Sequence, residues 1–180
     1  MHFAICDYIL DMVQNSLEAG ADLVELNLTE RYNGLTLILK DNGCGMTEVE
    51  LERAKDPFYT DGVKHASRKV GLGIPFLIQM AETSEGMFDI KSEKGVGTEV
   101  TVFFNTSNID TPPVGDLVSL FFQAMTFDGS YELIVNRQFP SGGKENYDLV
   151  RSQLKEILGD LNRAETMGLL RDFIASQEEN

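Results

Sequence analysis

The spacing of apolar and polar residues in the first third of the chain predicts a helix followed by a β-hairpin. Over residues 3–19 the apolar side chains fall on one broad helical face, and Gly20 suits the position just past a helix end. Over residues 23–43 apolar and polar residues alternate on both sides of Asn33-Gly34. That dipeptide is typical of a two-residue hairpin turn. We therefore expect one helix and two antiparallel strands in this region.

The next segments predict two more helices and a second pair of strands. A Thr-x-x-Glu capping box indicates a short helix over residues 47–56, and the polar, irregular stretch 57–73 indicates a loop. Helical spacing returns over 73–84, and 87–104 alternates like two strands joined by a glycine-containing turn. This order predicts an α/β fold, a two-layer sandwich in which helices cover a mainly antiparallel sheet.

A polar stretch with two prolines, residues 105–116, separates this unit from the rest of the chain. We therefore divide the sequence into a domain over 1–108 and a small α/β extension over 109–180. The extension is predicted to contain a helix, a strand and two amphipathic helices, over 116–126, 130–139, 145–159 and 164–176. Their apolar faces cover the first domain, form a dimer contact or dock a partner, and the sequence leaves these three alternatives open.

Composition and charge narrow the class of protein. The 180-residue chain is 42% hydrophobic and 24% charged, which is ordinary for a globular protein. No apolar run approaches the ~20 residues of a membrane span and the N-terminus has no secretory signal pattern, so we expect no membrane contact and a cytoplasmic location. The formal charge of −14 argues against a nucleic-acid partner, because binding phosphates depends on Lys and Arg. Cys6 and Cys44 are too few for a disulfide framework.

The first helix carries a pair of residues with candidate chemistry. Asp11 and Asn15 are four residues apart, so both side chains lie on one helix face and can reach one ligand. An Asn amide oxygen suits Mg²⁺, which takes one or two protein oxygens together with phosphates and waters. An aspartate can position or deprotonate a water. A solvated helix face is the simpler alternative for this pair taken alone.

Three glycine-containing segments add to this pair. In "DNGCGM", residues 41–46, Asp41 can accept a hydrogen bond from an exocyclic amine, while Gly43 and Gly45 allow a flat ring to approach the backbone. In "GLG", residues 71–73, glycines open a helix, where free N–H groups attract phosphate. In "GVGTEV", residues 95–100, Thr98 begins a strand. Each segment by itself is also explained by a turn or a helix junction.

Basic residues are concentrated around the predicted loop. Five of the fifteen in the chain fall within seventeen positions, at Arg53, Lys55, Lys64, Arg68 and Lys69. In so acidic a chain, this cluster favours a polyanionic ligand over a merely solvated loop.

These segments, in this order, resemble the motifs of the GHKL family of ATP-binding domains, which includes gyrase B subunits, ninety-kilodalton heat-shock chaperones, sensor histidine kinases and MutL. "DMVQNSLEAGAD" is similar to the family's N-box, "DNGCGM" to its G1 box, "VGLGIPFL" to its G2 box and "GVGTEVTVFF" to its last motif. "DPFYTDG" is similar to the phenylalanine-bearing segment of histidine kinases. The resemblance covers residues 3–105 and implies a Bergerat-type ATP-binding fold.

The resemblance also implies a site that binds ATP and Mg²⁺. Asn15 would be the Mg²⁺ ligand, and Asp41 would accept a hydrogen bond from the adenine amino group. Thr98 would support Asp41 through a water. Residues 57–73 would be the ATP lid, and one of its basic residues would reach the γ-phosphate. The implied cofactor-binding set is Asn15, Asp41, Gly43, Gly45, Met46, Lys64, Gly71, Leu72, Gly73 and Thr98.

The resemblance leaves the chemistry open. The N-box looks like that of MutL, whose general base is a glutamate four residues before the Asn, whereas this chain has Asp11 there. A carboxylate set back by ~1 Å can cost ~10²-fold in rate, so we expect slow hydrolysis. The lid segment looks like that of a kinase, but neither His2 nor His65 has the setting of a phosphoacceptor.

Three hypotheses therefore stand: a small ATPase or ATP-driven switch with Asp11 as catalytic base, a stand-alone protein kinase acting on a partner as anti-sigma-factor kinases do, and a nucleotide-sensing module without turnover. A protein partner is expected in addition to ATP, and a homodimer is left open.

Overall fold

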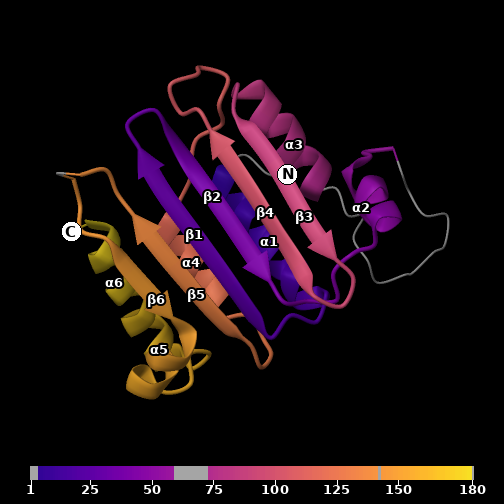
Figure 1. Cartoon of the computed structure of the whole chain (residues 1–180). Coiled ribbons are helices and arrows are strands. Elements are labelled where there is room, and N and C mark those ends of the chain that lie inside the picture. The colour runs from indigo at the N-terminus through magenta and orange to yellow at the C-terminus, as the bar shows by residue number, and fades with distance from the viewer. Residues whose placement is uncertain (1–3, 59–72, 142, 180) are drawn as a thin grey trace.

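The computed structural model describes residues 4–58, 73–141 and 143–179 and contains one six-stranded sheet (Figure 1). The strands are β1 Leu23–Arg31, β2 Gly34–Asp41, β3 Met87–Glu93, β4 Gly97–Phe104, β5 Glu132–Gln138 and β6 Tyr147–Val150. The helices are α1 Ile5–Glu18, α2 Glu48–Lys55, α3 Gly73–Thr83, α4 Leu117–Met125, α5 Arg151–Leu158 and α6 Ala164–Glu179. In the view of Figure 1, α1 and α4 lie behind the strands.

The sheet has the order β3-β4-β2-β1-β5-β6, and its only parallel pair in the described residues is β1 with β5. The predicted hairpin of β1 and β2 is present, but its turn lies one residue earlier than the Asn33-Gly34 pattern indicates: Tyr32 and Asn33 form the turn, and Gly34 begins β2 opposite Arg31. The predicted α/β sandwich with a mainly antiparallel sheet is thereby confirmed.

The core forms where the apolar face of α1 meets one face of the sheet. Ile5, Ile9 and Val13 recur at helical spacing and are fully buried. On β1, Val24, Leu26 and Leu28 alternate with polar residues and are also fully buried. Each such side chain stabilises the fold by about 1.5–3 kcal/mol relative to exposure. The intervening residues of the central strands therefore point to the opposite face of the sheet, which faces the viewer in Figure 1.

The C-terminal extension continues the same sheet. The predicted strand over 130–139 is present as β5, and it pairs with β1 along seven residues. Helix α4 packs against α1 and α6, so the extension shares the core of the first unit.

One expectation for the extension is wrong. The helix predicted over 145–159 begins only at Arg151, because Tyr147–Val150 forms β6. Buried Leu149 lies opposite Val135 of β5, and exposed Asp148 points away, so these residues follow a period of two. A four-residue strand is too short for its alternation to be recognised beside a helical pattern.

The predicted loop over 57–73 falls almost entirely on residues 59–72, which lie outside the described residues. No helix in the described part of the chain is both long and apolar enough to cross a membrane.

Candidate functional site

Helices α1 and α3 bring Asp11, Asn15 and Gly73 together. A Cβ atom added to Gly73 would lie 2.5 Å from Asp11 Oδ2, 2.8 Å from Met12 Cε and 3.3 Å from Asn15 Nδ2. Glycine is thus the residue that allows α3 to begin directly against this face of α1. The first N–H groups of a helix have no partner within it, so the start of α3 offers donors beside the Asp11–Asn15 pair.

A row of polar residues crosses three strand ends on the same side of the sheet. Asp41 on β2 lies opposite Thr98 on β4, and Thr98 lies opposite Ser92 on β3. The residues two positions earlier on β2 and two later on β4, Leu39 and Val100, are buried in the core. Because side chains two apart share a face, the polar row also faces the helices.

Asp41 is held by two donors. Ser16 Oγ donates to Asp41 Oδ2 at 2.7 Å, and the Gly43 backbone N–H donates to Asp41 Oδ1 at 2.8 Å. The Asp41 residue as a whole is only 9% exposed. Each of its oxygens has more than one acceptor position, so Asp41 is fixed in orientation and can still accept from a ligand.

Sequence reasoning missed Ser16, although a signal was present. Ser16 is buried and continues the series Ile5, Ile9, Met12 and Val13 on the apolar face of α1. A serine at such a position needs a hydrogen-bond partner inside the protein. Asp41 is that partner, 25 residues away in sequence.

The glycines of the loop after β2 lie against other segments of the chain. Gly45 has a φ of +58°, and a Cβ there would lie 1.9 Å from the Glu93 carbonyl oxygen. A Cβ on Gly43 would lie 3.1 Å from that of Ala19. Close approach of backbone to backbone therefore explains Gly45, and its contact with a flat ring stays a prediction.

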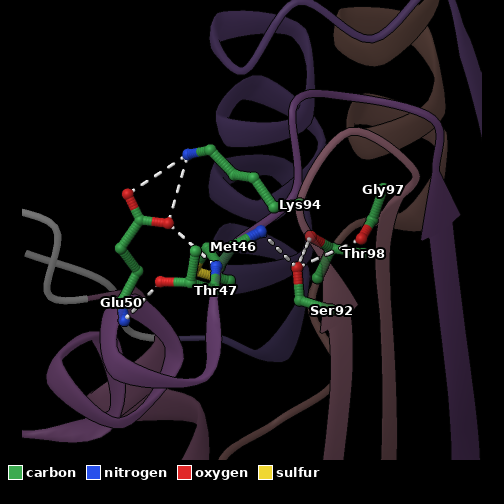
Figure 2. Close-up of polar contacts among 7 residues, drawn as sticks. All are labelled: Met46, Thr47, Glu50, Ser92, Lys94, Gly97 and Thr98. Carbon is green, nitrogen blue, oxygen red and sulfur yellow. Dashed lines mark hydrogen bonds and ion pairs between the residues drawn. The ribbon is translucent and has the colours of Figure 1, made fainter.

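A polar cluster ties this loop to the hairpin of β3 and β4 (Figure 2). Ser92 Oγ accepts from the Met46 N–H at 2.9 Å and lies 2.8 Å from Thr98 Oγ1. Lys94 Nζ lies 3.1 Å from Glu50 Oε2, joining the hairpin turn to the start of α2. No local pattern in the sequence indicates the contact of Ser92 with Met46, because these two residues are 46 positions apart.

Helix α2 begins with the predicted capping box. The Thr47 N–H donates to Glu50 Oε2 at 2.8 Å, and the Glu50 N–H donates to Thr47 Oγ1 at 3.2 Å. The N–H bond and then Lys94 hold the pKa of Glu50 below its usual range. The first turn of α2 is therefore fixed beside Met46.

Most of the other residues predicted for the site fall on the predicted loop and lie outside the described residues. Lys64, Gly71 and Leu72 lie outside the described residues, as do Arg68 and Lys69. Lys55 pairs with Glu52 of its own helix at 2.8 Å.

A pocket of about 340 Å³ lies at the same strand ends, and Asp41, Ser92 and Thr98 of the polar row are part of its lining. Its lining includes Glu25, Lys40, Lys91 and Glu99, which alternate with core residues along their strands. Asp11 and Asn15 are not among the described residues that line it. The pocket therefore adjoins the polar row at the strand ends, while the Asp11–Asn15 pair lies outside its described lining.

The donor set at α1 fits a nucleotide-bound Mg²⁺ better than a metal held by protein alone. No group of three or more His, Cys, Asp or Glu side chains suited to a metal occurs in the described part of the chain. Mg²⁺ bound with phosphates needs only one or two protein oxygens, which Asn15 and Asp11 can offer.

Comparison with known proteins identifies the class. Residues 4–108 match the family described as "Histidine kinase-, DNA gyrase B-, and HSP90-like ATPase". The chain therefore belongs to this family, and membership supports ATP binding.

Its curated relatives include kinases and sensors. It is 32% identical over 92 residues to "Sporulation kinase E" of Bacillus subtilis (strain 168), covering 49% of this chain and 12% of the relative. It is 30% identical over 108 residues to "Sensor histidine kinase YxdK" of the same organism, covering 59% and 33%. A "Putative sensor protein" of Shewanella frigidimarina (strain NCIMB 400) is 27% identical over 105 residues, covering 57% and 16%. The match thus spans a third or less of each of these relatives.

Proposed function

We propose that this chain binds ATP with Mg²⁺ and acts as a small ATPase or ATP-driven switch with slow hydrolysis. The observation that carries the proposal is the approach of Gly73 to Asp11 and Asn15, which brings an anion-attracting helix start beside a metal ligand and a base. Asp41, held by Ser16 and Gly43, supplies the acceptor for the adenine amino group.

In this proposal each residue has one task. Asn15 holds Mg²⁺, which neutralises charge on the phosphates when bound. The start of α3 binds phosphate oxygens. Asp11 accepts a proton from a water whose oxygen attacks the γ-phosphorus, and the bond to the bridging oxygen breaks, leaving ADP and phosphate.

The test uses ATP labelled at the γ-phosphate, with Mg²⁺, on wild type, Asp11→Asn and Asp11→Glu. We expect Asp11→Asn to lower phosphate release by about 10²–10⁴-fold, because the amide cannot take the proton. Asp11→Glu retains a base and should retain turnover. Unchanged phosphate release in Asp11→Asn would show that Asp11 is not the base.

A second candidate is a protein kinase acting on a partner, favoured by the relatives named as kinases. In the same assay with a lysate of the source cells, a kinase would move the label to a second protein instead of releasing it. A third candidate, a nucleotide sensor, would bind ATP and leave the label on it. A cytoplasmic location, a protein partner and a homodimer stay predictions.

A further inference from the structure

Ser92 lies at the centre of the polar cluster at the end of β3 and has three polar neighbours (Figure 2). Its Oγ is 2.9 Å from the Met46 nitrogen, 3.1 Å from the Gly97 carbonyl oxygen and 2.8 Å from Thr98 Oγ1. The side chain is partly buried, and it shares the helix-facing row with Thr98 and Asp41.

The direction of these hydrogen bonds follows from counting protons. A serine hydroxyl has one proton to donate and two lone pairs that accept. The Gly97 carbonyl can only accept, so its contact takes the Ser92 proton. The Met46 N–H and the Thr98 hydroxyl must then both donate to Ser92 Oγ. This is the assignment that satisfies all three contacts at once.

Thr98 then has no proton left for a ligand. Its hydroxyl proton points to Ser92, and only lone pairs remain for the side of the row where Asp41 lies. The Asp41 carboxylate also only accepts, with Ser16 and Gly43 as donors already in place. A water that donates to both Thr98 and Asp41 would itself present a lone pair. In each case the strand ends offer acceptors, which suit an amino group and disfavour a carbonyl oxygen.

We propose that Ser92 is a positioning residue that fixes the Thr98 hydroxyl as an acceptor. The site thereby selects purine nucleotides with an exocyclic amino group over those with a carbonyl oxygen at the same position of the ring. The inference rests on the proposed binding of the adenine base at Asp41. Ser92 acts through Thr98 and does not itself touch the nucleotide.

A purely structural role for Ser92 would give a different result. Ser92 also holds Met46, and its loss could loosen the loop and weaken all nucleotides alike. Lys94→Ala is the matched control, because it breaks another tie of the same hairpin, to Glu50, and leaves Thr98 and Ser92 intact. Ser92→Thr keeps the hydroxyl and should keep the selectivity.

The experiment measures the affinities of the whole chain for ADP and IDP with Mg²⁺ by calorimetry. These diphosphates differ in the exocyclic group and in the proton on the neighbouring ring nitrogen, and they avoid turnover. We expect wild type, Ser92→Thr and Lys94→Ala to prefer ADP. In Ser92→Ala the Thr98 proton is free to donate to a carbonyl, so the ADP:IDP affinity ratio should fall by about tenfold. If Ser92→Ala does not fold, Ser92→Cys, whose thiol is only a weak acceptor for the Thr98 proton, should lower the ratio in the same direction.

The outcomes separate this inference from the proposed function. Equal weakening of both nucleotides in Ser92→Ala, or an equal fall of the ratio in Lys94→Ala, would overturn the role of Ser92. Wild type that binds ADP and IDP equally would overturn the inference and leave nucleotide binding intact. Wild type that binds neither would overturn both.

Discussion

At Gly73 and Gly97 an added methyl group would meet different kinds of neighbour. At Gly73 the nearest atoms are the ends of the Asp11 and Met12 side chains, which can move aside. At Gly97 the φ is +140° and the Asp41 carbonyl oxygen would lie 2.0 Å away, so backbone must move. The two glycines therefore matter for different reasons, the first for the site and the second for the fold.

We expect Gly73→Ala to fold with nearly normal stability and to lose phosphate release, because the new methyl group displaces the Asp11 carboxylate. We expect Gly97→Ala to lower the free energy of unfolding by about 3 kcal/mol, since it combines a strained φ with a backbone clash. Urea denaturation and the labelled-phosphate assay measure both effects. Equal loss of stability in the two variants would contradict this distinction.

Single residues also show how far the sequence could predict the site. Asp11 and Asn15 were predicted to share a face because helical spacing is local. The approach of Gly73, and the bonds of Ser16 and Ser92, depend on the packing of distant segments. The order of the motifs indicated that Gly73 belongs to the same site as Asp11 and Asn15. No local pattern indicated the pairing of Ser92 with Met46.

The start of α2 depends on an ionised side chain. Glu50 accepts from the Thr47 N–H and pairs with Lys94, and these contacts lower its pKa. A carboxylate with a lowered folded-state pKa stabilises the structure above its unfolded-state pKa, and this contribution is lost as the pH falls through the folded value. The pH range in which Glu50 loses this stabilising contribution therefore lies below about pH 4.5.

We expect the Thr47 amide to become less protected from hydrogen exchange as the pH falls through that window, relative to the intrinsic exchange rate. Glu50→Gln should show the low-pH behaviour already at neutral pH, because it cannot form the ion pair with Lys94. Lys94→Ala should shift the loss of protection toward higher pH. Protection that does not depend on pH in wild type would mean that the ionised form of Glu50 does not hold α2.

At the level of elements, local signals were reliable and long-range pairings were not. The hairpin pattern around Asn33-Gly34 and the Thr47 capping box are short patterns with a direct physical cause; the hairpin and the cap are both present, with the turn itself at Tyr32-Asn33. The parallel pairing of β5 with β1 joins residues more than a hundred positions apart, so no local pattern contains it. The four residues of β6 carry too little periodicity to distinguish a strand from the start of the following helix.

Across the whole molecule, Arg137 on β5 connects the first hairpin to the last helix. The side chain is 2% exposed, and its guanidinium pairs with Glu30 of β1 at 2.5 Å and with Glu178 of α6 at 3.0 Å. Tyr147 of β6 also contacts Glu178, and burial together with that carboxylate raises the pKa of its hydroxyl. One buried cation thus joins segments from both parts of the sequence.

Arg137→Ala should lower the free energy of unfolding by about 3 kcal/mol, because the largely buried Glu178 carboxylate loses its cation, whereas the half-exposed Glu30 carboxylate can be solvated instead. Arg163→Ala is the control, since Arg163 is exposed and lies 3.8 Å from Asp160, and should change stability by less than about 0.5 kcal/mol. Urea denaturation followed by circular dichroism measures both.

The same network predicts that the extension and the first unit unfold together. Strand β5 pairs with seven residues of β1, and α4 packs on α1. Neither part can therefore open without exposing the core of the other. In native-state hydrogen exchange, amides of β1 and β5 should lose protection with the same free energy and the same urea dependence. If the β5 amides exchanged at lower urea while β1 stayed protected, the extension would be a separate cooperative unit, and Arg137→Ala would then destabilise it alone.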